Sequence, residues 1–333
     1  MSNFLYFLYF LKISDWGRLR SHFNFTLKKY QLGRWRLFWD VVGCALKYGI
    51  SFHEYFYYDF AGKTAAQRAE YASMGFMYRY QKRMNPPGKR EMLADKHKFD
   101  RAFAEFMHRG IMNPLTATTE EVADFIRGKD KVVLKRSTGG GGKNVKIVAV
   151  EGTAEESAKA IQTDAVANRF DLMEEFIHQH PALQELSPNS LNTVRFITQR
   201  KDDGTVEVIG ASLRMGITKN TDNLSSGGIT CKINLDTGKL DSLGYSFDIT
   251  QPLCEAHPVS GVKLVGFQIP CWDEVKSMCL QAAAKYADNK CIGWDVAIKS
   301  DGPLLIEGNH DWGARVWQMP AGKGMKRLLE KYL

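Results

Sequence analysis

Three oxygen-bearing side chains near the C-terminus have the types and spacing to bind a hard metal ion. The stretch 292–313 is typical of a strand, a Ser-Asp-Gly-Pro turn and a second strand. Asp295 lies among apolar residues on the first strand, and Glu307 and Asn309 lie two apart on the second. Glu307 and Asn309 therefore share one side of the second strand, and a hairpin can bring Asp295 opposite them. This arrangement suits Mg²⁺ shared with substrate phosphates; the alternative is strand-end acids that face solvent.

A second stretch, KVVLKRSTGGGGKNVKIVAV at 131–150, could close over a phosphate. Two β-branched runs of strand length flank four consecutive glycines, whose bare N–H groups can approach an anion. Walker A would require a glycine at Ser137 and a hydroxyl residue at Asn144, and the dinucleotide fingerprint would require a third glycine at Asn144 followed by a helix. The stretch therefore predicts a hairpin with Lys135 on its first strand, acting as a lid over a nucleotide. A plain flexible hairpin is the alternative.

The elements around these stretches would position further polar groups. The spacing of apolar residues predicts a helix over 95–109, with Asp95 as its N-cap and Lys96 in its first turn, beside a site for an anion. A surface lysine is the alternative for Lys96. A helix over 155–169 and a strand over 171–177 are expected next.

Strands at 192–199, 206–215 and 229–234 are predicted to form an antiparallel meander. Arg195 and Arg214 alternate with apolar neighbours on these strands. Half-buried arginines need an anionic partner, which is either a structural carboxylate or a phosphate. An amphipathic helix is expected from 272 to 288, before the strands that carry Asp295 and Glu307.

The N-terminal part is basic, aromatic and predicted to be helical over 30–85. The apolar run at 4–11, FLYFLYFL, is too short to span a bilayer. It either lies in a membrane interface, helped by Arg18, Arg20, Lys28 and Lys29, or packs on the body of the protein. The aromatic residues of 30–85 form either a sugar-binding platform or core. Asn85-Pro-Pro-Gly88 is the predicted boundary of this segment.

The totals describe a globular chain of 333 residues with a net charge of +8. Residues 1–130 hold 21 Lys and Arg against 13 Asp and Glu, whereas 131–333 hold 24 of each. A basic region favours an anionic partner: ATP, a lipid-phosphate carrier, a membrane surface or, ranked last because no module is recognisable, nucleic acid. Six cysteines without paired spacing indicate neither a zinc site nor a disulfide framework. We therefore expect a cytoplasmic protein, with peripheral attachment to the inner face of the membrane as a further alternative.

The order of these motifs resembles that of the ATP-grasp superfamily over about residues 90–320. The matching landmarks are Lys96, Lys135, MEEFI at 173–177, Arg214, NLSSGG at 223–228, Asp295, Glu307 and Asn309. GWDVAI and LLIEGN, with the aromatic N-terminal segment, are similar to the sugar-transfer-associated ATP-grasp group. The resemblance implies an α+β ATP-grasp fold in which two α+β subdomains clamp ATP. Its catalytic domain would span 88–333, with a lid at about 131–177, behind a helical segment at 1–87.

The resemblance also implies roles for individual residues. Residues implied to bind the nucleotide are Lys96, Lys135, Ser137, Gly140, Gly141, Gly142, Glu174, Glu175, Phe176, Ile177 and Glu185. Among these, Glu174 or Glu175 with nearby backbone groups would read adenine, and Glu185 would meet the ribose. Asp295, Glu307 and Asn309 would hold Mg²⁺, while Arg214, Lys135 and Arg195 would act in catalysis.

The implied reaction is Mg-ATP-dependent carboxylate–amine ligation through an acyl phosphate, in the biosynthesis of a polysaccharide or cell-surface glycan. The partners would be a small-molecule or glycan carboxylate and an amine acceptor, with membrane or lipid-carrier contact through the N-terminus. A kinase acting on a sugar or polyol hydroxyl would use the same ATP site. A non-catalytic nucleotide-sensing scaffold is the third alternative.

Overall fold

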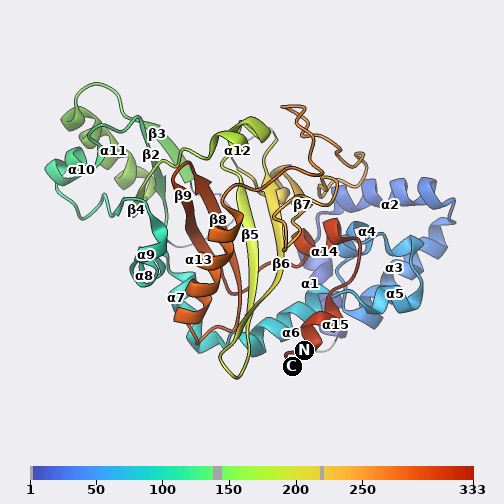
Figure 1. Ribbon diagram of the computed structural model, residues 1–333. Coiled ribbons are helices and arrows are strands. Elements are labelled where there is room, and N and C mark those ends of the chain that lie inside the picture. Colours follow the sequence, from blue (N-terminus) through green and yellow to red (C-terminus); the bar gives the residue numbers. More distant parts are fainter. Residues whose placement is uncertain (1–2, 138–144, 218–220) are drawn as a thin grey trace.

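The computed structural model describes residues 3–137, 145–217 and 221–333. Two antiparallel sheets organise the described chain, a five-stranded sheet in the order β7-β6-β5-β8-β9 and a four-stranded sheet in the order β1-β4-β2-β3. Figure 1 shows the four-stranded sheet on one side of the central sheet and helices α1 to α5 on the other. The structure is the α+β arrangement that the sequence predicts.

The central sheet is held between two layers of helix because its strands alternate between them. Its strands are β5 (Thr193–Arg200), β6 (Val206–Met215), β7 (Ile229–Lys232), β8 (Cys291–Lys299) and β9 (Gly302–Asn309). Phe196 packs in the core with α13 (Trp272–Lys285), whereas the next residue, Ile197, packs with α6 (Met74–Met84) and α14 (Arg315–Ala321). The predicted meander and C-terminal hairpin are both confirmed.

The four-stranded sheet contains the predicted glycine-rich hairpin. Its strands are β1 (Ile111–Met112), β2 (Lys131–Lys135), β3 (Val145–Ala149) and β4 (Leu172–Glu175), covered by α10 (Thr119–Ile126) and α11 (Ala154–Asn168). β2 and β3 pair from Lys131 opposite Ala149 to Lys135 opposite Val145. The tip at 138–144, with Gly140, Gly141 and Gly142, lies outside the described residues. β4 ends at Glu175, two residues before the predicted end.

The single helix predicted over 95–109 is wrong. The structure has α7 (Glu91–Ala94), α8 (Lys96–Ala102) and α9 (Ala104–Met107), and it breaks at Phe103 and again at His108, which has a positive φ of 42°. The break lets Phe103 turn onto Trp294 of the central sheet, with ring centroids 5.5 Å apart. The predicted cap is confirmed, because the Asp95 side chain accepts a hydrogen bond from the Lys98 amide at 3.1 Å.

The N-terminal segment is helical, as predicted. It comprises α1 (Asn3–Ile13), α2 (Trp16–Tyr30), α3 (Arg34–Tyr48), α4 (Phe52–Tyr57), α5 (Ala65–Ala69) and α6. The first four share an aromatic core that includes Tyr55 and Phe60. None of the helices in the described ranges has the length and apolarity needed to cross a bilayer.

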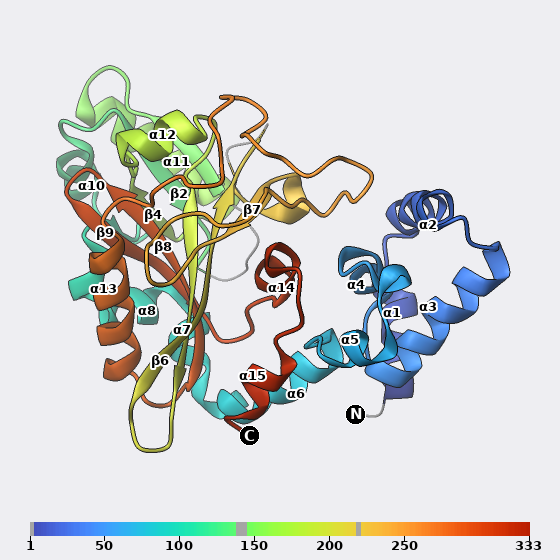
Figure 2. The ribbon, with the colours of Figure 1, turned by 45° about the vertical axis from the view of Figure 1, so that its right-hand side comes forward.

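Helix α6 packs with the central sheet, although it precedes the predicted domain boundary at 87. Its Phe76, Met77 and Tyr80 lie in one core with Ile197 and Trp317. Figure 2 shows α6 running from the N-terminal helices to the base of the sheet beside α15 (Lys326–Glu330). We therefore propose that the unit built on the central sheet begins at α6, before the predicted boundary.

A buried amide joins the C-terminal helices to the N-terminal segment. Gln318 on α14 accepts hydrogen bonds from the backbone amides of Ala72 and Met325, at 2.8 and 2.9 Å. Its amide donates to the Ala72 carbonyl at 2.9 Å and to the Tyr58 hydroxyl at 3.0 Å. The side chain is fully buried, so water cannot replace these bonds.

We expect Gln318→Ala to lower the free energy of unfolding by about 3 kcal/mol, because buried amide and carbonyl groups lose their partners. Gln281→Ala, at an exposed position of α13, is the matched control and should be nearly neutral. Urea unfolding of both variants measures the effect. A loss below about 1 kcal/mol in Gln318→Ala would show that the joint is not needed for stability.

Candidate functional site

Two arginines share one buried carboxylate on the central sheet. Arg195 on β5 lies directly opposite Asp295 on β8. Its guanidinium donates to both oxygens of Asp295, at 2.6 and 3.1 Å, and Arg214 on β6 donates to one of them at 3.0 Å. Asp295 is 3% exposed. Burial alone would raise the pKa of Asp295, but Arg195 and Arg214 outweigh it and lower this pKa to about 2.

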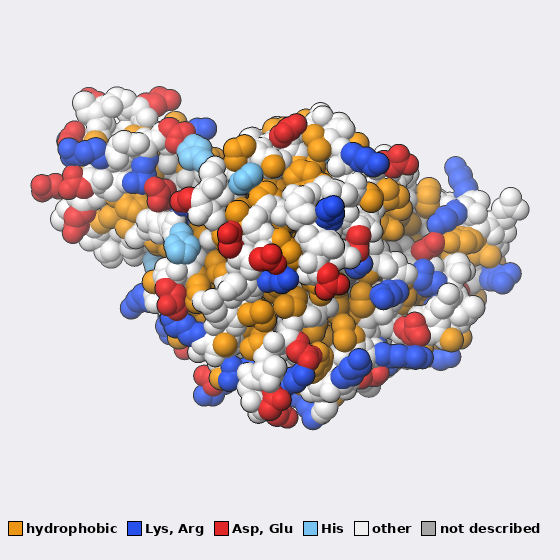
Figure 3. Space-filling view, in the orientation of Figure 1, with side chains coloured by type: hydrophobic (Ala, Val, Ile, Leu, Met, Phe, Trp, Pro, Cys, Tyr) orange, Lys and Arg blue, Asp and Glu red, His pale blue; other side chains and the backbone are white. Residues whose placement is uncertain are grey.

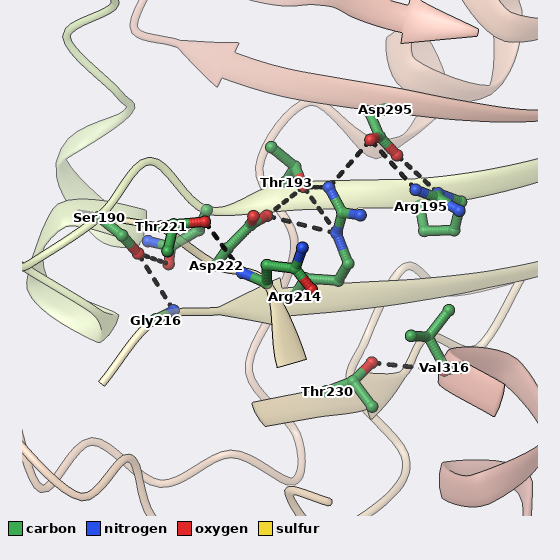
Figure 4. A network of polar contacts seen from close by, with 12 residues as sticks. Ser190, Thr193, Arg195, Arg214, Gly216, Thr221, Asp222, Thr230, Asp295 and Val316 are labelled. Atoms are coloured by element: carbon green, nitrogen blue, oxygen red, sulfur yellow. Dashed lines mark hydrogen bonds and ion pairs between the residues drawn. The ribbon is translucent and has the colours of Figure 1, made fainter. Parts of the chain in front are cut away.

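Arg214 has two more partners beside this pair (Figure 4). Its guanidinium donates to the Thr193 hydroxyl at 3.0 and 2.6 Å and lies 3.3 Å from Asp222. The Thr193 hydroxyl donates to Asp222 in turn. Burial raises the pKa of Asp222, although Arg214 opposes this. Asp222 was missed by the sequence analysis, and its place directly before NLSSGG was the available signal.

Glu307 and Asn309 face the same side of β9, as predicted, and Glu307 is paired with Asp295 across the hairpin. The Asn309 amide donates to Glu307 at 3.2 Å and to the Gly293 carbonyl at 3.3 Å. Its carbonyl oxygen accepts no side-chain hydrogen bond from the described residues. Burial, and then repulsion from Asp295, raise the pKa of Glu307.

The three predicted metal residues are therefore neighbours, but the two arginines bind both oxygens of Asp295. Within the described ranges, no group of three or more His, Cys, Asp or Glu side chains could hold a metal ion. The oxygens best placed to accept a cation are those of Glu307 and Asn309. Both are hard ligands of the kind that Mg²⁺ takes.

A second ion cluster joins the two sheets. Glu174 on β4, which is 3% exposed, forms ion pairs with Lys135 of β2 at 2.5 Å and with Arg109 at 3.3 Å. Arg109 also donates to the carbonyl of Leu305 on β9 at 2.5 Å. Burial alone would raise the pKa of Glu174, but Lys135 and then Arg109 lower it to about 2. Arg109 was missed, since a single arginine after a helix carries no spacing signal.

Lys96 lies at the edge of this cluster. Its ammonium donates to the Ser137 carbonyl at 3.2 Å, and the Ser137 amide donates to Asp171 at 2.7 Å. The structure thus brings the first turn of α8 to the end of β2, as the predicted phosphate site requires. Asp100, one turn after Lys96, was missed as well. Burial raises the pKa of Asp100 to about 6, and one of its carboxylate oxygens has no hydrogen-bond partner in the described part of the chain.

The remaining residues predicted to bind the nucleotide lie outside the two ion clusters. The Glu175 carboxylate accepts a hydrogen bond from the Gly110 amide at 3.0 Å, and the Glu175 amide donates to the Gly110 carbonyl. Phe176 and Ile177 are partly buried just beyond β4. Glu185 is exposed on α12 (Pro181–Leu186) and makes no ion pair with any described residue.

The family described as sugar-transfer associated ATP-grasp matches residues 76–332. The ATP-grasp ligase PsnB complexed with minimal precursor is a similar solved structure, with 14% identity, a TM-score of 0.43, and coverage of 78% of this chain and 67% of that one. Biotin carboxylase from Campylobacter jejuni has 14% identity and a TM-score of 0.47, and the match covers 78% of this chain and 51% of that one. D-alanine-D-alanine ligase from Coxiella burnetii has 10% identity and a TM-score of 0.42, over 72% and 56%. A search of curated proteins returned no significant match.

We expect Glu174→Gln to lower the free energy of unfolding near neutral pH by about 3 kcal/mol, because Lys135 and Arg109 lose a buried counter-charge. The folded pKa of about 2 lies below the ordinary value of 4.5. The ionised carboxylate therefore stabilises the fold above that ordinary value, and this contribution disappears as the pH falls toward 2.

Urea unfolding of both proteins at about pH 7 and about pH 3 measures this difference. Glu175→Gln, on the same strand but half-exposed, is the control and should change stability little. An equal deficit of Glu174→Gln at both pH values would contradict the electrostatic origin.

Proposed function

Because this chain belongs to the sugar-transfer associated ATP-grasp family, we propose that it is an Mg-ATP-dependent ligase that joins a carboxylate to an amine through an acyl phosphate. One observation carries the proposal: the two buried ion clusters meet on β9. Arg109 of the sheet-joining cluster binds the carbonyl of Leu305, and Glu307, two residues further along β9, lies opposite Asp295. A nucleotide held at the first cluster would direct its phosphates toward the second.

The nucleotide end of the site would use side chains for phosphate and backbone for adenine. Lys135 is the last residue of β2, Lys96 donates to the Ser137 carbonyl just beyond it, and phosphate oxygens are suitable acceptors for both. Glu174 is paired with both β1 and β2, so its backbone groups are already bonded and its carboxylate serves Lys135. Phe176 and Ile177, just beyond the paired residues, are therefore the groups we assign to the adenine edge.

The balance of buried charges around Asp295, Glu307 and Asn309 is suited to a bound divalent cation. The buried groups Arg195 and Arg214 carry two positive charges, whereas Asp295, Asp222 and Glu307 carry three negative charges when ionised. Burial raises the pKa values of Asp222 and Glu307, and repulsion from Asp295 adds to the rise for Glu307, so a cation bound here would oppose these effects. Glu307 and Asn309 would hold Mg²⁺, and Asp295 would contribute a lone pair that its arginines leave unused. When bound, the ion would neutralise charge on the transferring phosphoryl group.

The proposed reaction has two steps and needs no protein nucleophile. A carboxylate oxygen attacks the γ-phosphorus of ATP, ADP leaves, and an acyl phosphate forms. The amine then attacks the acyl carbon, loses a proton, and expels phosphate as the amide forms. Arg214, which lies 3.3 Å from Asp222 directly before the 223–228 stretch, would stabilise the developing oxyanion, and Arg195 would hold Asp295 in place. We propose a glycan or small-molecule carboxylate as the acid, in polysaccharide assembly in the cytoplasm.

Product analysis tests this proposal directly. The chain is incubated with Mg-ATP, uronic-acid oligosaccharides and candidate amines, and the products are analysed by mass spectrometry. Ligation yields ADP, free phosphate and a new amide. A phosphorylated sugar without free phosphate would assign the kinase alternative. Nucleotide binding without turnover of any acid and amine would favour the scaffold.

We expect Lys135→Met to weaken Mg-ATP binding by about tenfold or more, because the phosphates lose a charge-assisted hydrogen bond. Titration calorimetry of protein whose folding is verified by circular dichroism gives the affinity. Lys146→Met, on the paired strand β3 but exposed, is the matched control and should bind ATP normally. Unchanged affinity in Lys135→Met would remove this lysine from the nucleotide site.

We expect Glu307→Gln to reduce phosphate release by about a hundredfold or more, since it removes a charge that would hold the metal. The variant should unfold no more easily than the parent without nucleotide, because Glu307 is repelled by Asp295. Glu274→Gln, at an exposed position of α13, is the control for both measurements. A destabilised but fully active Glu307→Gln protein would instead make Glu307 a structural ion-pair partner.

A further inference from the structure

The exposed tryptophans of this protein all lie in its first three helices. Trp16, Trp35 and Trp39 are 57%, 77% and 63% exposed. The other four tryptophans are at most 5% exposed: Trp272, Trp294, Trp312 and Trp317. Large aromatic side chains seldom remain in water at this density without a partner.

Helix α3 has two apolar faces, and only one of them is covered. Leu37, Val41, Cys44 and Ala45 face the N-terminal core. A second stripe at helical spacing is turned outward, formed by Trp35, Phe38, Trp39, Val42 and Leu46. The aromatic residues of 30–85 are thus of two kinds: Tyr48 of α3 packs against the core, whereas Trp35, Phe38 and Trp39 of the same helix are exposed.

Helix α1, which packs against α3, also carries exposed apolar residues. Phe4, Leu5, Leu8 and Tyr9 are exposed along it, whereas Tyr6 and Phe10 are buried. The two helices pack against each other, and the Asn3 side chain donates to the Lys47 carbonyl at 3.1 Å. We call the exposed apolar residues of α1 and α3 the docking face.

The docking face belongs to the most basic part of the chain. Residues 1–48 contain eight Lys and Arg but only two Asp and Glu. Their charge of +6 is most of the net charge of +8. Of the two acids, Asp15 caps α2, and Asp40 is bound by Arg68 at 2.7 Å and by the Tyr55 hydroxyl at 2.5 Å. Figure 3 shows Lys and Arg around apolar side chains at the end of the molecule formed by these helices.

We propose that α1 and α3 dock the protein on the surface of a lipid bilayer that contains anionic lipids. Exposed tryptophan, phenylalanine and leucine insert at the boundary between headgroups and acyl chains, and the surrounding lysines and arginines pair with the headgroups. A second copy is a poorer occupant, because two surfaces with this positive charge repel each other. The inference is independent of the proposed ligase chemistry.

Vesicle sedimentation of the full chain tests the docking face. Vesicles of phosphatidylcholine alone are compared with an equal mixture of phosphatidylcholine and phosphatidylglycerol, at low and high salt. We expect binding to the anionic vesicles that weakens with salt. The triple variant Trp35→Ala, Phe38→Ala, Trp39→Ala should lose about tenfold or more of this binding. A control triple variant changes Val166, Leu253 and Val259 to alanine, which are exposed elsewhere, and it should bind normally.

Tryptophan fluorescence gives a second measurement, since Trp16, Trp35 and Trp39 are the exposed fluorophores. Anionic vesicles with brominated acyl chains should quench the wild-type protein. The conservative variant Trp35→Phe, Trp39→Phe should still sediment with vesicles but be quenched less. This pattern places α3 in the interface, which a merely electrostatic contact would not do.

Three outcomes would overturn the proposal. One is equal binding to neutral and anionic vesicles, and another is unchanged binding of the alanine triple variant. The third is a concentration-dependent dimer in ultracentrifugation that this variant dissociates, which would assign the face to a second copy. Melting curves establish that each variant is folded, and ATP turnover measured without vesicles separates failure of docking from failure of the ligase proposal.

Discussion

The central sheet depends on one buried carboxylate shared by two arginines. Asp295 lies between Trp294 and Val296, whose side chains face the opposite layer with α13. A slip of one residue between β5 and β8 would turn Asp295 into that apolar layer, leave Arg195 without this anion, and leave Arg214 with Asp222 alone. The ion cluster therefore specifies the register of three strands, and the same register brings Glu307 opposite Asp295. The arrangement that holds the sheet also assembles the proposed metal position.

The sheet-joining cluster acts in the same way between the sheets. Arg109 is bound to Glu174 on one side and to Leu305 on the other, so the position of the glycine-rich hairpin is coupled to the strand that carries Glu307. Phosphate arriving at Lys135 would compete with Glu174 for the same ammonium. The buried ion pairs consequently provide a physical route by which nucleotide binding can change the contact between the two sheets, because each partner lost must be replaced by another charge.

Local patterns in the sequence predicted those features that depend on neighbours in the chain. The hairpins, the Asp95 cap and the shared face of Glu307 and Asn309 follow from strand alternation and capping, and the structure has all of them. The family and the α+β fold are confirmed. The break at Phe103 could not be predicted from neighbours in the chain, because the ring contact that accompanies it is with Trp294, which is far away in the sequence. Arg109 and Asp222 were missed for a similar reason, since each acquires its role from a partner on another element.

Contacts of α4 and α14 join the N-terminal helices to the part of the chain that carries the central sheet. The ring of Tyr57 on α4 stacks on the ring of Phe247, with their centroids 4.8 Å apart. The Arg315 guanidinium lies 5.0 Å from the centroid of the Phe247 ring. Arg315 begins α14, six residues after Asn309, and Gln318 in the same helix binds Ala72 and Tyr58. These contacts fix the docking face relative to the strands that carry Glu307. A bilayer bound at α1 and α3 would therefore lie in a defined place relative to the proposed metal position, which would suit an acceptor that is itself held at the membrane.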